Sequence, residues 1–215
     1  IRDNPGFSPC YSSLVQMNNI EHFVHPGLFR DLEKARATLE LAKTAVQLDP
    51  VDSRAHLCCG WSYMMALRES EAAPHMQLAC ELNDNDPWTL LSSAHYSAIC
   101  GSIEDARVRA ERSLALSPAP SYLEWAYHGT VRFFCGDYEG TIEACDRAQG
   151  INKILPAWRA AALFQLGKPE LAQQEIQRAA AALARRVTVG RHAGRRSRPL
   201  GQFITKHLGA GMALY

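Results

Sequence analysis

The sequence has no long hydrophobic run. Its most apolar stretch, residues 157–166, is short and is interrupted by Arg159 and Gln165, whereas a membrane-spanning helix needs about 18 or more predominantly apolar residues. The opening residues, IRDNPGFSPC, also lack the basic segment, apolar run and cleavage site of a secretory signal. We therefore expect no membrane association. Because the first residue is Ile1 rather than Met, we expect a fragment or a processed chain.

The motifs of common catalytic and cofactor sites are also missing. The sequence contains no GxxxxGK[ST], GxGxxG, GxSxG or HExxH motif. His22 and His25 are three residues apart, and His56 precedes Cys59 by three, so each pair would offer two metal ligands on one helix face. Neither pair is accompanied by a second pair at zinc-site spacing. We predict no enzyme activity, no cofactor and no metal, and we keep a metal-binding or enzyme-accessory role as an alternative.

The cysteines do not form a disulfide framework. There are seven of them, an odd number, and they mostly fall where a helical repeat places a small buried residue. Thiols that stay reduced are typical of the cytoplasm. We therefore predict a cytoplasmic protein with free cysteines.

The net charge of +1 conceals an uneven distribution along the chain. Residues 176–215 contain eight Lys and Arg and no Asp or Glu, so residues 1–175 carry 15 basic and 22 acidic side chains, a net charge of −7. This pattern indicates an acidic folded body followed by a basic tail.

What the sequence does contain is a repeated helix–turn–helix pattern, clearest in residues 87–118. Asp86 and Pro87 are typical of a helix start, Gly101 of a turn between helices, and residues 102–105 of a second helix start. Ser117 and Pro118 end the unit. The pattern recurs, since the helix ends at Pro50, Asp84 and Pro118 are 34 residues apart and the turn glycines Gly101, Gly136 and Gly167 are 35 and 31 apart.

This pattern resembles the tetratricopeptide repeat (TPR), a unit of about 34 residues with a large apolar residue, Gly or Ala, and Tyr in its first helix and two Ala in its second. Residues 53–86 match through Gly60, Tyr63, Ala72 and Ala79. The next two units, 87–120 and 122–155, match through Leu90, Ala94, Ala106, Ala110, Ser113 and Pro118, and through Trp125, Gly129, Cys145 and Ala148.

The resemblance implies an all-α fold, a right-handed α-solenoid of about five TPR-like helix–turn–helix units. We expect an N-terminal extension at residues 1–10, the solenoid at 11–182 and a flexible basic tail at 183–215. Two features depart from the repeat. Pro74 lies inside an expected second helix, where we predict a late start or a kink, and in the tail we expect at most one short helix over residues 203–208.

A solenoid of this kind lines its concave face with the first helix of each unit. Side chains there would form an aromatic and aliphatic groove for a peptide or helix, with Trp, Tyr and Arg as anchors. Alternatively, individual members belong to the core between repeats. The predicted groove residues are Arg54, Leu57, Trp61 and Met64, then Trp88, Leu91, His95 and Ala98, then Leu123, Tyr127, Thr130 and Phe133.

The groove differs from the carboxylate clamps of this family, which hold chaperone C-termini with Lys and Asn. The corresponding positions here are apolar or aromatic for the most part, so we do not expect a clamp. They are Leu57, Trp61, Met65, Leu91, His95 and Ile99.

The sequence leaves three interpretations of the basic tail open. The tail would bind the phosphates of a nucleic acid, contact an acidic surface such as the folded body, or remain solvated and disordered. Because no aromatic residues interleave with Arg185–Arg198, base stacking is not indicated.

We expect a non-enzymatic scaffold that binds a protein or peptide. The unit after Pro118–Pro120 resembles bacterial repeat regions that follow a class III adenylate cyclase domain or a winged-helix regulator domain. That resemblance implies the regulatory part of a bacterial signalling protein with an attached effector domain. The alternative is a nucleic-acid adaptor that acts through the basic tail.

Overall fold

The computed structural model describes residues 1–24, 32–151 and 155–190. All regular secondary structure in these ranges is α-helical, as predicted. The helices are α1 (Ser8–Val24), α2 (Leu32–Leu48), α3 (Ser53–Met65), α4 (Glu69–Leu82), α5 (Pro87–Ile99), α6 (Ile103–Leu116), α7 (Tyr122–Phe134), α8 (Tyr138–Arg147), α9 (Leu155–Gln165) and α10 (Pro169–Gly190).

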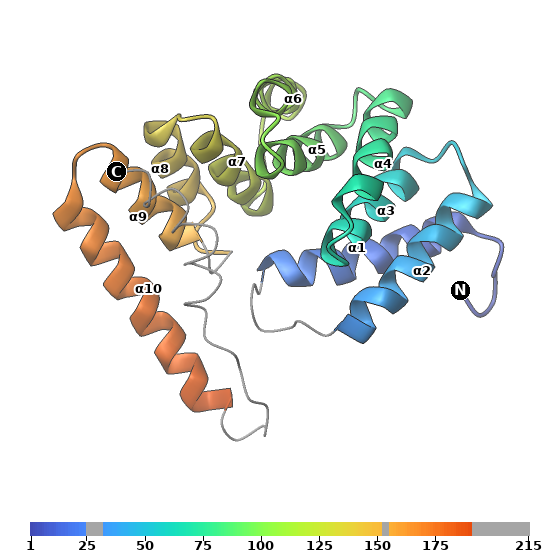
Figure 1. Cartoon of the computed structure of the whole chain (residues 1–215), viewed down its shortest axis with the longest axis horizontal. Helices are drawn as coiled ribbons and strands as arrows, with labels where there is room; N and C mark the ends of the chain where they lie inside the picture. Colours follow the sequence, from blue (N-terminus) through green and yellow to red (C-terminus); the bar gives the residue numbers. More distant parts are fainter. Residues whose placement is uncertain (25–31, 152–154, 191–215) are drawn as a thin grey trace.

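The helices pack as five consecutive hairpins. Each odd-numbered helix contacts the even-numbered helix that follows it, and α1, α3, α5, α7 and α9 also contact one another in order. The hairpins follow an arch, with α6 and α10 on its outer side and α5 and α9 inside them (Figure 1). This is the layout of the predicted helical-repeat solenoid. In the described part of the chain, no helix is both long and apolar enough to cross a membrane.

The turn within a hairpin has one recurring geometry in the four hairpins whose turns are described. Between α5 and α6, Gly101 N–H donates to Ala98 O (3.3 Å) and Ser102 N–H donates to Ser97 O (2.8 Å). These two bonds form a Schellman motif, which puts one residue in the left-handed backbone region. The residues in that position are Leu67, Gly101, Gly136 and Gly167, with φ angles of 61°, 87°, 78° and 71°.

Leu67 is the exception among these four turn residues. Left-handed backbone suits glycine because a Cβ atom crowds the following carbonyl there. The Leu67 side chain is 77% exposed, so burial of its apolar surface does not offset this strain. The α3–α4 turn is therefore less favourable than the glycine turns of its neighbours.

The helix starts depend on side-chain caps at several units. Asp86 accepts hydrogen bonds from Trp88 N (3.3 Å) and Thr89 N (3.1 Å), so the predicted cap is confirmed. Ser102 occupies the cap position of α6, but its side chain makes no capping bond.

Small residues let the two helices of a hairpin approach closely. Gly60 of α3 faces Met76 of α4 so closely that a Cβ atom on Gly60 would lie 3.0 Å from the Met76 Cγ and Cε atoms. In the next hairpin, Ala94 of α5 and Ala106 of α6 are both 0% exposed and share one core cluster. The predicted register is therefore correct for the helix faces that meet inside these hairpins.

Three expected boundaries differ from the structure. Helix α1 begins at Ser8 rather than near residue 11, and the Ser8 hydroxyl donates to Ala45 O (3.0 Å), which fixes this first turn against α2. Helix α10 continues past residue 182 to Gly190, because its alanine-rich sequence favours helix. Helix α4 does not start late, since it begins at Glu69 and contains Pro74. The predicted short helix at 203–208 lies outside the described residues.

Substitutions at two turn residues test how much the left-handed backbone at Leu67 lowers the free energy of unfolding. We expect Leu67→Gly to raise the free energy of unfolding by about 1 kcal/mol, because it relieves left-handed strain. The control is Gly101→Ala, which should lower it by about 1 kcal/mol, since a Cβ at Gly101 meets no atom within 4 Å and only the backbone is affected. Urea unfolding measures both, and a stabilised Gly101→Ala would contradict this account.

The close approach of α5 and α6 gives a second test. Ala106→Trp should lower the free energy of unfolding by about 1–3 kcal/mol or more through overpacking. Val108→Trp, on the same helix at a side chain that is 51% exposed, is the matched control and should change it little. Equal effects of the two substitutions would mean that Ala106 does not face α5.

Candidate partner-binding groove

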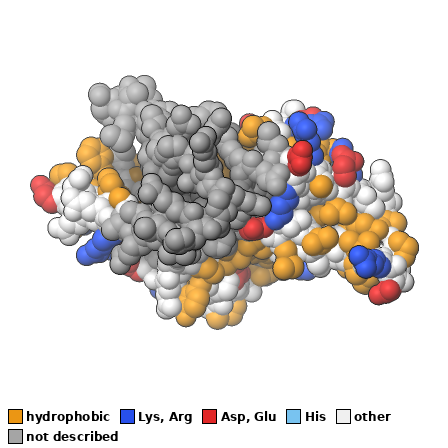
Figure 2. Space-filling model, turned by 90° about the horizontal axis from the view of Figure 1, so that it is seen from below, with side chains coloured by type: hydrophobic (Ala, Val, Ile, Leu, Met, Phe, Trp, Pro, Cys, Tyr) orange, Lys and Arg blue, Asp and Glu red, His pale blue; other side chains and the backbone are white. Residues whose placement is uncertain are grey.

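The predicted groove residues lie on three neighbouring helices, α3, α5 and α7. Helix α5 contacts both α3 and α7, and Figure 1 shows α5 on the inner side of its hairpin. On the underside of the arch, hydrophobic side chains lie beside one another over much of the coloured surface (Figure 2). The arrangement places the predicted positions from three units along one face.

Four of the predicted side chains form a continuous aromatic row. The ring centroids of Trp61 and His95 are 5.4 Å apart, those of His95 and Tyr127 are 4.6 Å apart, and those of Tyr127 and Trp88 are 5.1 Å apart. Spacings of this size are those of interacting aromatic pairs. The row crosses all three helices, so it joins three repeat units.

A hydrogen bond fixes one end of the row. The Trp61 Nε1–H group donates to the Ser92 hydroxyl at 2.6 Å, and Ser92 is 1% exposed. Ser92 was not predicted, because only the three-dimensional contact between α3 and α5 reveals that it lies beside Trp61. The indole is therefore held in place while part of its surface stays accessible.

The predicted residues differ in how much surface they offer a partner. Leu57, Leu91 and Thr130 are at most 3% exposed, and Thr130 donates to Ala126 O within its own helix. His95 and Tyr127 are each 4% exposed, and Ala98 is 1% exposed. The side chains with accessible surface are those of Arg54, which is exposed, and of Trp61, Met64, Trp88, Leu123 and Phe133, which are half-buried.

Some predicted residues belong to the packing between units. Leu57 joins the core cluster of Met76 and Tyr96, against which Trp61, Met64 and Trp88 pack. Phe133 contacts the rings of Tyr138 (5.7 Å) and Trp158 (5.0 Å) on α8 and α9, so it is not part of the aromatic row. Arg54 and Leu123 lie in the first turns of α3 and α7.

The aromatic row carries no charge at neutral pH. Burial lowers the pKa of His95 to about 3, so its imidazole is neutral. Burial also raises the pKa of the Tyr127 hydroxyl well above its usual value, so the phenol stays protonated. Such a surface favours apolar and neutral polar contacts over ion pairs.

The described residues form no cluster of potential metal ligands. No group of three or more His, Cys, Asp or Glu side chains in these ranges is arranged to hold one. His56 and Cys59 both lie near His75 of α4, a residue that the sequence did not indicate. His22 and His25 fall outside the residues whose side chains are described.

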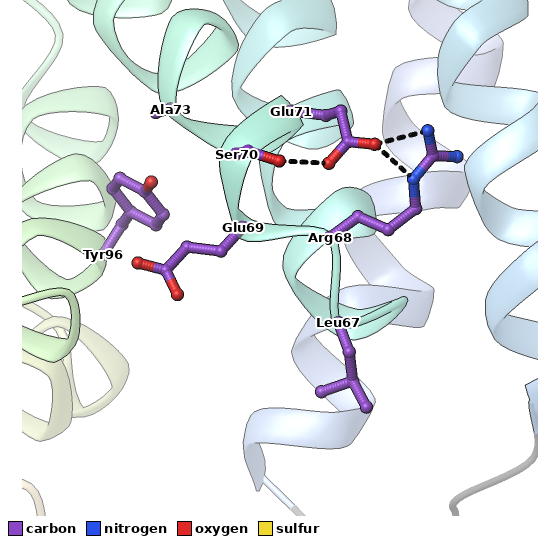
Figure 3. A pocket seen from close by; sticks show the side chains of 7 residues that line it. All are labelled: Leu67, Arg68, Glu69, Ser70, Glu71, Ala73 and Tyr96. Atoms are coloured by element: carbon purple, nitrogen blue, oxygen red, sulfur yellow. Dashed lines mark hydrogen bonds and ion pairs between the residues drawn. The ribbon is translucent and has the colours of Figure 1, made fainter.

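A second surface feature lies at the α3–α4 turn (Figure 3). It is an open hollow, in which Glu71 accepts hydrogen bonds from Arg68 and Ser70 while Tyr96 of α5 forms the opposite wall. It differs from the neutral aromatic row because its lining includes the charged side chains of Arg68, Glu69 and Glu71. The lining residues are Leu67, Arg68, Glu69, Ser70, Glu71, Ala73 and Tyr96.

One of three comparisons with known proteins bears on the fold. No protein-family model matches the sequence, and no curated protein matches it. Among solved structures, the crystal structure of the MamA protein, which contains TPR units, is similar with a TM-score of 0.51 and 14% identity. The match covers 88% of this chain and 98% of MamA. This chain therefore has an all-α, TPR-like helical-repeat fold.

Proposed function

We propose that this protein is a non-enzymatic scaffold that binds a protein partner through the groove formed by α3, α5 and α7. The supporting observation is the aromatic row of Trp61, His95, Tyr127 and Trp88, which joins three repeat units on one face. Large, rigid aromatic side chains are the residues on which binding energy concentrates at protein interfaces. The partner segment is a peptide or an amphipathic helix.

The chemistry of the groove narrows the kind of segment. The row is neutral, and Met64 and Leu57 beside it are apolar. A charged segment would lose its hydration in such a site without gaining ion pairs. We therefore expect the contacting face of the partner to be apolar or aromatic, with the exposed Arg54 of α3 available to an acidic residue.

We also propose a cytoplasmic setting. All seven cysteines are free, and burial raises the pKa of the Cys58 thiol to about 12 and that of Cys145 to about 12. Such thiols remain protonated and unreactive, which fits a reducing compartment.

The broader role rests on the resemblance of the segment after Pro118–Pro120 to bacterial repeat regions that follow a cyclase or winged-helix domain. On that basis we propose a regulatory part of a bacterial signalling protein, with an effector domain attached. Reading the gene upstream of the codon for Ile1 tests this, since an adjacent unrelated gene would contradict it. The nucleic-acid alternative depends on the basic tail at residues 183–215, of which residues 191–215 lie outside the described structure.

The groove is tested by selecting peptides from a displayed random library against the protein and measuring their affinity. We expect Trp88→Ala to weaken binding of selected peptides about tenfold or more, because it removes a half-buried aromatic anchor. Tyr127→Leu should weaken it as well, since the row loses its central ring. The control is Val108→Ala on α6, whose side chain faces solvent on the outer helix.

Circular dichroism of each variant separates binding from folding. Peptides that bind Trp88→Ala and Tyr127→Leu as tightly as the unmodified protein, with helicity intact, would contradict the groove. A protein truncated after residue 190 separates binding by the groove from binding by the tail. Peptide binding by the groove should persist in the truncated protein. Binding to mixed-sequence DNA that vanished on truncation would support the nucleic-acid alternative.

A further inference from the structure

Two histidines face each other between α3 and α4, outside the aromatic row. The Nδ1 atoms of His56 and His75 are 2.9 Å apart, and their ring centroids are 5.1 Å apart. The Nε2 atom of His56 lies 2.9 Å from Pro50 O. The Nε2 atom of His75 lies 3.7 Å from the Cys59 Sγ atom. These contacts link the α2–α3 turn to α4 through one chain of polar groups.

The geometry fixes the direction of each hydrogen bond in this series of four polar groups. A carbonyl oxygen only accepts, so His56 must carry its proton on Nε2 and donate to Pro50 O. Its Nδ1 atom is then an acceptor, so His75 must donate from Nδ1. That leaves the His75 Nε2 atom as an acceptor for the Cys59 thiol. The two imidazoles therefore hold opposite tautomers.

The arrangement suits a proton and does not suit a metal ion. A separation of 2.9 Å between ring nitrogens is that of a hydrogen bond. The two nitrogens of His75 point to different partners, so His56 and Cys59 do not converge with it on one point.

We propose that His56 and His75 form a hydrogen-bonded pair that can add one proton, but not two, without losing the bond between the rings. This pair makes the α3–α4 hairpin sensitive to acid. One added proton enters at His75 Nε2, and the Cys59 thiol turns so that its sulfur accepts from the new N–H. A second proton has to enter at His56 Nδ1, where the His75 N–H already points. It breaks the bond between the rings and places two positive charges side by side.

The surroundings do little to stabilise the added charge. Tyr63 of α3 stacks on His75 at 5.5 Å, and the Arg68 guanidinium covers Tyr63 at 5.0 Å. From α2, Lys43 and Glu40 both act on the Cys59 thiol, but the Glu40 carboxylate accepts a hydrogen bond from Lys43 (2.7 Å). Among the described contacts, neither imidazole is hydrogen-bonded to a carboxylate.

The direction of the pH effect follows from these surroundings. Burial, and then the proximity of His56, lower the pKa of His75. The unfolded chain, in which histidine has a pKa of about 6.5, therefore binds protons at a higher pH than the folded hairpin does. The pair therefore does not change the free energy of unfolding at a pH well above the unfolded-state pKa of about 6.5. The free energy of unfolding falls as the pH drops through that value.

The first test uses the unmodified protein. Long-range ¹H–¹⁵N spectra at about pH 7.5, where free histidine is neutral, should show His56 protonated on Nε2 and His75 protonated on Nδ1. Finding both rings in the Nε2–H form would overturn the proposal, because their facing Nδ1 atoms would then have no proton to share. This measurement does not depend on the folding of a variant.

The second test compares variants by amide hydrogen exchange. His75→Gln keeps a donor toward His56 but does not titrate. We expect the exchange of α3 and α4, corrected for intrinsic rates, to accelerate between about pH 7.5 and 5.5 by roughly five- to tenfold more in the unmodified protein than in His75→Gln. An equal acceleration in the two proteins would overturn the proposal.

His128→Gln is the matched control. His128 is another buried histidine, 1% exposed on α7, and burial followed by Arg132 lowers its pKa to about 4. Its substitution should change the acid response of α7 and α8 and leave that of α3 and α4 intact. If His128→Gln abolished the α3–α4 response as His75→Gln does, the response would be global and the pair would not be its source.

Discussion

The structure depends on the close approach of the two helices in each hairpin. Gly60 against Met76 and Ala94 against Ala106 show how little space separates them. Small residues at these contacts allow the two helices of a hairpin to approach closely. The same helices then present larger rings on another face, and stacking of successive hairpins brings those rings together.

This division explains why the candidate groove is aromatic and neutral. On α5, Ala94 meets α6 inside the hairpin, while the adjacent residue His95 contacts rings from both neighbouring units. His95 and Tyr127, each 4% exposed, therefore pack one repeat against the next, whereas the half-buried Trp61 and Trp88 at the two ends of the row offer surface to a partner. Rigidity of this kind reduces the ordering cost of binding, since Trp61 is already held by Ser92.

The sequence was sufficient for the hairpins because their signals are local. A cap at Asp86, a glycine at Gly101 and alanines on one face are each visible within a single unit. The turn at Leu67 was missed for the same reason, since a leucine gives no local sign of left-handed backbone. Contacts between units could not be predicted from one repeat, and the half-buried Phe133 packs against Trp158 of the next unit instead of joining the aromatic row. The pairing of His56 with His75 required the fold.

These departures from the repeat are concentrated in the α3–α4 hairpin. Leu67 strains its turn, and Pro74 removes the backbone donor that would pair with Ser70 O. The α5–α6 and α7–α8 hairpins have glycine turns and no proline inside a helix interior. In an array whose units contact only their neighbours, local opening occurs where the unit is weakest. That unit also carries Trp61 and Met64, so opening of the second hairpin would remove one end of the aromatic row while α5 and α7 retain the other.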